Sequence, residues 1–126
     1  MSQLPILVIE DDPDGQFVIA RMLKQVQLDV VLAASAEEGW ELLQERSFAG
    51  AIIDLALPGK DGFQMLALIR SHPKLRRLKC VAVTAYHTPM LKHNALEVGF
   101  DAYFAKPVNR TLFLGAMEEL IFQNEY

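Results

Sequence analysis

Four carboxylates, Glu10, Asp11, Asp12 and Asp14, lie within five positions directly after the apolar stretch 4–9. Carboxylates this close repel one another, and the repulsion raises their pKa values unless a cation neutralises them. Asp12 and Asp14 fall at the start of a segment with helical spacing, so we interpret Asp12 as a helix N-cap and Asp14 as a first-turn acid that suits the helix dipole. Glu10 and Asp11 remain as candidates for a cation site.

Three other side chains that could take part in chemistry each end or follow an apolar stretch. Asp54 ends GAIID, Thr84 ends CVAVT, and Lys106 comes directly after DAYFA. A carboxylate can attack a phosphoryl group and form an acyl phosphate, provided that the charge of the incoming group is neutralised. A hard cation held by carboxylates, a lysine ammonium and a hydroxyl donor would together supply that neutralisation. These residue types suit phosphoryl transfer if the fold brings them together.

The elements that must position these residues alternate along the chain. Five short apolar stretches predict buried strands, at residues 4–9, 29–34, 50–54, 80–84 and 101–105. A segment with helical spacing or helix-start signals follows each strand, including a capping box of Ser35 and Glu38 and N-caps at Thr88 and Asn109. Strict alternation predicts a parallel sheet between two helical layers, with a site beyond the carboxyl ends of the strands.

Composition narrows the class of protein. The chain has 126 residues, of which 52% are hydrophobic, so we expect one domain over residues 1–126 and no output domain. No apolar run approaches the length of a membrane span, and no basic-then-apolar signal pattern begins the chain. Cys80 is the single cysteine and cannot form an internal disulfide, which fits the cytoplasm.

The charge argues against a nucleic-acid partner. The net charge is −4, whereas general nucleic-acid binders are basic. One basic stretch, RSHPKLRRLK at residues 70–79, interrupts this pattern. It contains Pro73 and no interleaved aromatic residue, so we interpret it as a solvated loop.

Four pieces of sequence at the predicted strand ends carry a resemblance to a known family. They are ILVIEDD (6–12), IIDLALPGKDG (52–62), VTA (83–85) and GFDAYFAKP (99–107). In this order and spacing they resemble the receiver domain of two-component response regulators, over essentially the whole chain. The resemblance implies an α/β fold of the flavodoxin-like, doubly wound kind. Its five-stranded parallel sheet has the order 2-1-3-4-5 and carries five helices.

The resemblance also implies roles for individual residues. Asp54 would be the phosphate acceptor. Glu10, Asp11 and Asp54 would hold Mg²⁺ together with the backbone carbonyl of Ala56. Thr84 and Lys106 would contact the phosphoryl group.

Signalling follows from the same resemblance. Tyr103 would be the switch aromatic that responds to Thr84, and the face made by the fourth helix, fifth strand and fifth helix would then bind a downstream target or a second copy of the chain. Apolar residues on that face are Met90, Leu91, Phe104, Leu112 and Phe113. The donor would be a histidine kinase or histidine phosphotransfer protein, which would meet the first helix around residues 16–24. We therefore expect a phosphoacceptor switch with slow self-dephosphorylation, not a conventional enzyme.

Two alternatives remain at this point. The first is a receiver-like interaction module that is never phosphorylated, although the acceptor, the acid pair, the hydroxyl and the lysine are all present. The second is a Mg²⁺-dependent phosphatase with an aspartyl nucleophile, which would want an acid two residues after Asp54, where Ala56 stands.

Two neighbours of the site residues bear on the lifetime of an acyl phosphate. Ala56 has no side chain that could orient a water, and Tyr86, two residues after Thr84, could shield the acyl phosphate from in-line attack. Together they predict a long-lived phosphorylated state.

Overall fold

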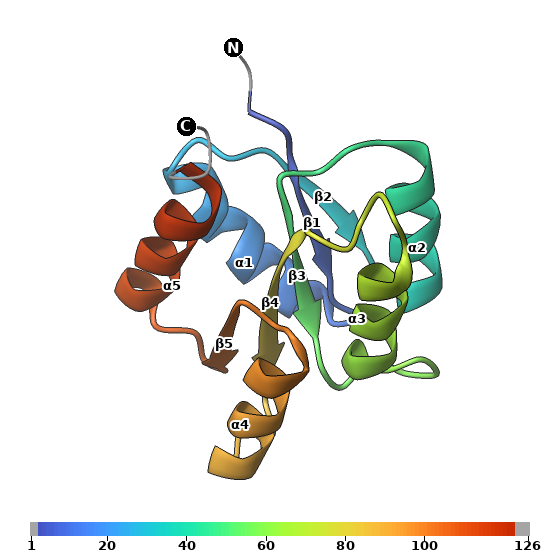
Figure 1. Cartoon of the computed structure of the whole chain (residues 1–126). Coiled ribbons are helices and arrows are strands. Elements are labelled where there is room, and N and C mark those ends of the chain that lie inside the picture. The colour runs from blue at the N-terminus through green and yellow to red at the C-terminus, as the bar shows by residue number, and fades with distance from the viewer. Residues whose placement is uncertain (1–2, 123–126) are drawn as a thin grey trace.

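A single parallel sheet forms the centre of the protein. The structure, a computed structural model, describes residues 3–122. The sheet has five strands in the order β2-β1-β3-β4-β5 (Figure 1). Their bounds are β1 Ile6–Ile9, β2 Val30–Ala33, β3 Gly50–Asp54, β4 Lys79–Thr84 and β5 Ala102–Ala105. The predicted flavodoxin-like α/β fold and strand order are confirmed, with strand ends shifted by one or two residues.

Five α-helices connect and follow the strands. They are α1 Pro13–Gln25, α2 Ala36–Glu45, α3 Gly62–Ser71, α4 Pro89–Val98 and α5 Arg110–Met117. Each begins at a side chain that accepts a hydrogen bond from the first turn, and these N-caps are Asp12, Ser35, Asp61, Thr88 and Asn109. The last helix continues as a π-helical turn, Glu118–Phe122.

Alternating side chains along each strand fill two separate cores. In β1, Ile6 and Val8 pack with residues of α1 and α5, whereas Leu7 and Ile9 pack with residues of α2 and α3. Figure 1 shows α1 and α5 covering one face of the sheet and α2 and α3 the other. A sheet buried on both faces explains why its strands read as continuous apolar runs.

One local expectation, the capping box of Ser35 and Glu38, is wrong in detail. The Glu38 carboxylate accepts from the backbone N–H of Ala34, not from that of Ser35, so the predicted capping box is not formed. A full capping box occurs instead at Asp61 and Gln64. Met90, one of the apolar residues that the sequence places on the predicted signalling face, is 66% exposed in the first turn of α4.

Candidate functional site

Three carboxylates meet at the carboxyl edge of the sheet. β1 ends directly before Glu10 and Asp11, and β3, its neighbour in the sheet, ends on Asp54. One oxygen from each carboxylate lies within 4.8 Å of the others. Glu10 is 1% exposed and Asp54 5% exposed, while Asp11 is open to solvent. The sequence-predicted acids therefore form one cluster at the mouth of the fold.

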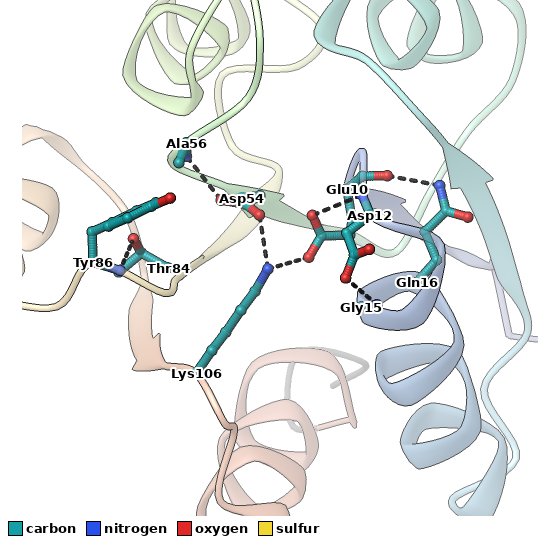
Figure 2. Close-up of polar contacts among 9 residues, drawn as sticks. All are labelled: Glu10, Asp12, Gly15, Gln16, Asp54, Ala56, Thr84, Tyr86 and Lys106. Carbon is teal, nitrogen blue, oxygen red and sulfur yellow. Dashed lines mark hydrogen bonds and ion pairs between the residues drawn. The ribbon is translucent and has the colours of Figure 1, made fainter.

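Lys106 joins two of these acids. It follows β5 and precedes a cis peptide bond to Pro107. Its Nζ donates to Asp54 Oδ2 at 2.8 Å and also contacts Glu10 Oε1, as the dashed lines of Figure 2 show. One ammonium therefore lies between the two buried carboxylates, which reduces their mutual repulsion.

Burial and these contacts shift the pKa values of all three groups. Burial, together with a hydrogen bond to Asp54, raises the pKa of Glu10 to about 7. Burial also acts to raise the pKa of Asp54, but hydrogen bonds with Glu10, Lys106 and the Ala56 backbone outweigh it and lower that pKa. Burial would lower the pKa of Lys106, yet its bonds to Asp54 and Glu10 raise it. At neutral pH Asp54 is thus an ionised carboxylate beside a charged ammonium, as a nucleophile in this position requires.

The start of α1 holds Glu10 in place, a contact that is hard to foresee from sequence patterns. The Gln16 side-chain amide donates to the Glu10 carbonyl at 2.7 Å, and the Asp12 N–H points to Glu10 Oε2 at 3.4 Å. Gly15 leaves room for the Glu10 side chain, because a Cβ at this position would lie 2.9 Å from Glu10 Cδ. In the sequence, only the position of Gly15 shortly after the candidate ligand Glu10 could have pointed to this close contact.

The turn after β3 and the end of β4 complete the mouth of the site. Asp54 Oδ1 accepts from the Ala56 N–H at 2.8 Å, which orients the carboxylate. Thr84 is 1% exposed, and its Oγ1 accepts from the Tyr86 N–H at 3.1 Å. Tyr86 is 71% exposed, and in Figure 2 its hydroxyl end points toward Asp54.

Tyr103 lies inward against the loop that follows β4. It is 8% exposed, and its hydroxyl is 2.9 Å from His87 Nδ1. Burial raises the pKa of this phenol. Sequence patterns do not reveal the bond between His87 and Tyr103, because the two residues belong to different elements.

Comparison with known proteins identifies the family. Residues 6–118 match the model of the response regulator receiver domain. The chain belongs to this family. A relative of known sequence, an uncharacterised 14.6 kDa protein of Leptolyngbya boryana, is 35% identical over 109 residues, which cover 86% of this chain and 83% of that protein.

Solved structures of receiver domains have the same fold. A putative response regulator from Chloroflexus aurantiacus superimposes with a TM-score of 0.90 at 25% identity, covering 96% of this chain and 99% of that one. The receiver domain of the sensor histidine kinase PA1611 from Pseudomonas aeruginosa superimposes with a TM-score of 0.86 at 28% identity, again covering 96% and 99%. That structure has a magnesium ion coordinated in its active-site cleft.

Several relatives are much longer than this chain. It spans 16%, 50% and 14% of three other curated relatives, so it corresponds to one part of each. Across residues 3–122, none of the helices has the length and apolar character needed to cross a membrane.

Proposed function

We propose that this receiver domain accepts a phosphoryl group on Asp54 from a phosphohistidine of a histidine kinase or histidine phosphotransfer protein. The observation that carries the proposal is the position of Asp54. It lies at the carboxyl end of the central strand, beside two further carboxylates and 2.8 Å from the Lys106 ammonium. This arrangement offers a nucleophile together with charge to stabilise the incoming group.

The donor set fits a hard divalent cation. Glu10, Asp11 and Asp54 supply three carboxylate oxygens within 4.8 Å of one another, two of them from buried side chains. Oxygen ligands and a compact acidic cluster suit Mg²⁺. We assign these three side chains and the backbone carbonyl of Ala56 as its ligands. The bound ion would neutralise charge on the phosphoryl group during transfer.

The residues of the chain then have distinct tasks. A carboxylate oxygen of Asp54 attacks phosphorus, the bond from phosphorus to the donor imidazole nitrogen breaks, and the electron pair stays on the imidazole. Lys106 and the Thr84 hydroxyl contact the phosphoryl oxygens and stabilise their charge. Hydrolysis later transfers the phosphoryl group to water and restores the Asp54 carboxylate. The protein therefore acts as a phosphoacceptor switch.

The signal would leave through the face made by α4, β5 and α5. Met90 and Leu112 are 66% and 65% exposed there, Leu91 and Phe104 are partly buried, and Phe113 belongs to the core. A contact between the phosphoryl group and Thr84 would favour a different position of Tyr103, and so a different form of this face. A downstream target or a second copy of the chain would bind that form. We propose that the phosphodonor meets α1.

Intact-mass measurement after incubation with Mg²⁺ and a small acyl phosphate tests the proposal. We expect the wild type to gain one phosphate and Asp54→Asn to gain none. Omitting Mg²⁺, or replacing Asp11 by Asn, should slow labelling strongly because the incoming charge is then less well neutralised.

Each result separates the alternatives. No phosphate on the wild type would favour an interaction module that is not phosphorylated, and equal labelling of Asp54→Asn would place the acceptor elsewhere. The identity of the partners, a location in the cytoplasm and action without an output domain remain predictions.

A further inference from the structure

A wide basic hollow lies at the amino edge of the sheet, opposite the carboxylate cluster. It has a volume of about 1120 Å³ and lies between the loop from α2 to β3 and the segment from α3 to β4. In Figure 1 these connections lie at the upper end of the sheet, away from the strand tips that carry the site. We call it the basic hollow.

Half of the cationic side chains of the protein gather around this hollow. They are Arg46, Arg70, Lys74, Arg76, Arg77 and Lys79, six of the twelve lysines and arginines in the chain. Among residues 3–122, only two acids, Glu45 and Asp101, line it as well, so these lining residues have a formal net charge of +4 in a chain whose net charge is −4. This uneven distribution of charge gives the hollow a positive electrostatic potential, although the net charge of the protein is negative.

Arg70 has a structural role in the wall of the hollow. Its guanidinium donates to the carbonyls of Arg76, Leu78 and Gly99 and pairs with Asp101 at 3.2 Å. The Asp101 carboxylate also accepts from the Cys80 N–H at 2.9 Å. These bonds hold the backbone of the segment that carries most of the other cations, so the wall of the hollow has a defined structure.

The remaining five cations have no acidic partner within the described part of the chain. Arg46 lies over the ring of Phe48 at 5.5 Å, and neither Lys74, Arg76, Arg77 nor Lys79 makes an ion pair with any residue between 3 and 122. Arg46, Lys74, Arg76 and Arg77 are exposed. Unpaired like charges repel one another, and an anionic ligand would relieve that repulsion.

We propose that the basic hollow is a docking site for an acidic segment of a partner protein. The hollow exceeds the usual size of small-molecule sites, which favours a chain of several residues. Within the described part of the chain, the one aromatic residue that lines it is Phe48, which is buried beneath Arg46, so none of these lining residues offers a free ring for stacking on a nucleic-acid base. The negative charge of the rest of the protein would also repel an extended nucleic acid.

Docking at the hollow would be independent of the phosphoacceptor. β3 runs from Gly50, next to the hollow, to Asp54 at the opposite edge, so a segment bound at one end leaves the other end open. The hollow could therefore hold a partner before, during and after phosphorylation. This inference goes beyond the proposed phosphorelay function and does not depend on it.

The test measures binding of a fluorescent decaglutamate peptide by anisotropy at low and at high salt. We expect saturable binding at low salt that weakens as salt screens the charges, and no binding of a decaglutamine peptide. The triple variant K74Q/R76Q/R77Q should bind about tenfold more weakly, because three exposed charges are removed from the hollow. Asp54→Asn should bind as the wild type does, whatever the outcome of the phosphorylation test.

A matched variant distinguishes the effect of the hollow cations on peptide binding from the effect of the protein's net charge. R21Q/K24Q/K92Q removes three exposed cations elsewhere and has the same net charge as the hollow variant. It should keep wild-type affinity within about twofold. Equal loss in the two triple variants, or no peptide binding at all, would overturn the proposal. A single-stranded oligonucleotide that binds more tightly than the peptide, with the same dependence on the hollow cations, would replace it with a nucleic-acid site.

Discussion

Glu10 is the residue in this site whose charge is least favourable. Its side chain is almost completely enclosed, and Asp54 lies across the same lysine from it. Ionising a second carboxylate there is opposed both by burial and by the neighbouring negative charge. Folding therefore favours the protonated form of Glu10 in the absence of a metal ion.

This gives a pH dependence with a definite sign. The pKa of Glu10 is about 7 in the folded protein against 4.5 for the free side chain. In EDTA, the free energy of unfolding should therefore fall as pH rises from about 4.5 to about 7 and then level off. The loss has an upper bound of about 3–4 kcal/mol, at roughly 1.4 kcal/mol per pKa unit. The opposite shift of Asp54 acts below its free value of 3.8, outside this window.

Urea unfolding of the wild type and Glu10→Gln between pH 4.5 and 8 measures the effect. The glutamine variant has no proton to release, so it should be the more stable protein above pH 7 and should lack this fall. Parallel profiles for the two proteins would show that Glu10 is not the group responsible.

Tyr86 is a second residue whose effect can be isolated. It follows the buried Thr84 and extends an exposed ring, whose hydroxyl end points toward Asp54, over the mouth of the site (Figure 2). Removing the ring in Tyr86→Ala should speed the loss of phosphate from Asp54 several-fold, because water then reaches the acyl phosphate more easily. Tyr86→Phe keeps the ring and serves as the control. Decay measured on the isolated phosphoprotein that is unchanged or slower in the alanine variant would contradict the shielding role.

At the scale of the elements, two helical glycines differ in the space that is available for a side chain. Gly15 in the first turn of α1 faces the Glu10 carboxylate, whereas a Cβ at Gly115 in α5 would meet nothing within 4 Å. Alanine is the better helix former at both positions. The two substitutions differ only in what the added methyl group meets.

We predict opposite effects on stability. Gly115→Ala should raise the free energy of unfolding by about 0.5–1 kcal/mol, because it removes the conformational freedom of glycine without a clash. Gly15→Ala should lower it by about 1–3 kcal/mol, because Glu10 has to move away from Lys106 to make room. Urea unfolding measures both. A Gly15→Ala protein that gains stability like Gly115→Ala would show that Glu10 moves freely.

Element placement also shows what a single sequence can predict. Strict alternation of apolar runs and helical segments placed Asp54, Thr84 and Lys106 at strand ends, and parallel strands bring such ends to one edge. The strand order came from the family resemblance, because alternation alone permits several orders.

Contacts between distant elements were beyond the reach of sequence patterns. The bond between His87 and Tyr103 depends on how the loop after β4 folds over β5. The basic stretch at residues 70–79 was interpreted as a solvated loop, and all five of its cations are exposed or partly so. Its closeness to Arg46 depends on how α2 and α3 pack. Pairings of this kind are set by the tertiary structure.

At the scale of the whole molecule, the two ends of the parallel strands carry opposite charge. Acids gather where the strands end, and cations gather where they begin. A partner with both an acidic segment and a phosphohistidine could approach either edge without covering the other. The fold thus offers two independent surfaces on a chain of 126 residues.

The fourth helix, α4, is held to the rest of the molecule by few buried side chains. Ala95 is its one buried residue, while each of the other four α-helices buries two or more. Few packing interactions would therefore have to be given up if phosphorylation moved α4, and a second position of the helix would then lie close to this one in free energy. An event that favours one of them by only about 1.4 kcal/mol changes their ratio tenfold. With a helix held by so few buried residues, a small local contact at the site would be sufficient to redistribute such a population.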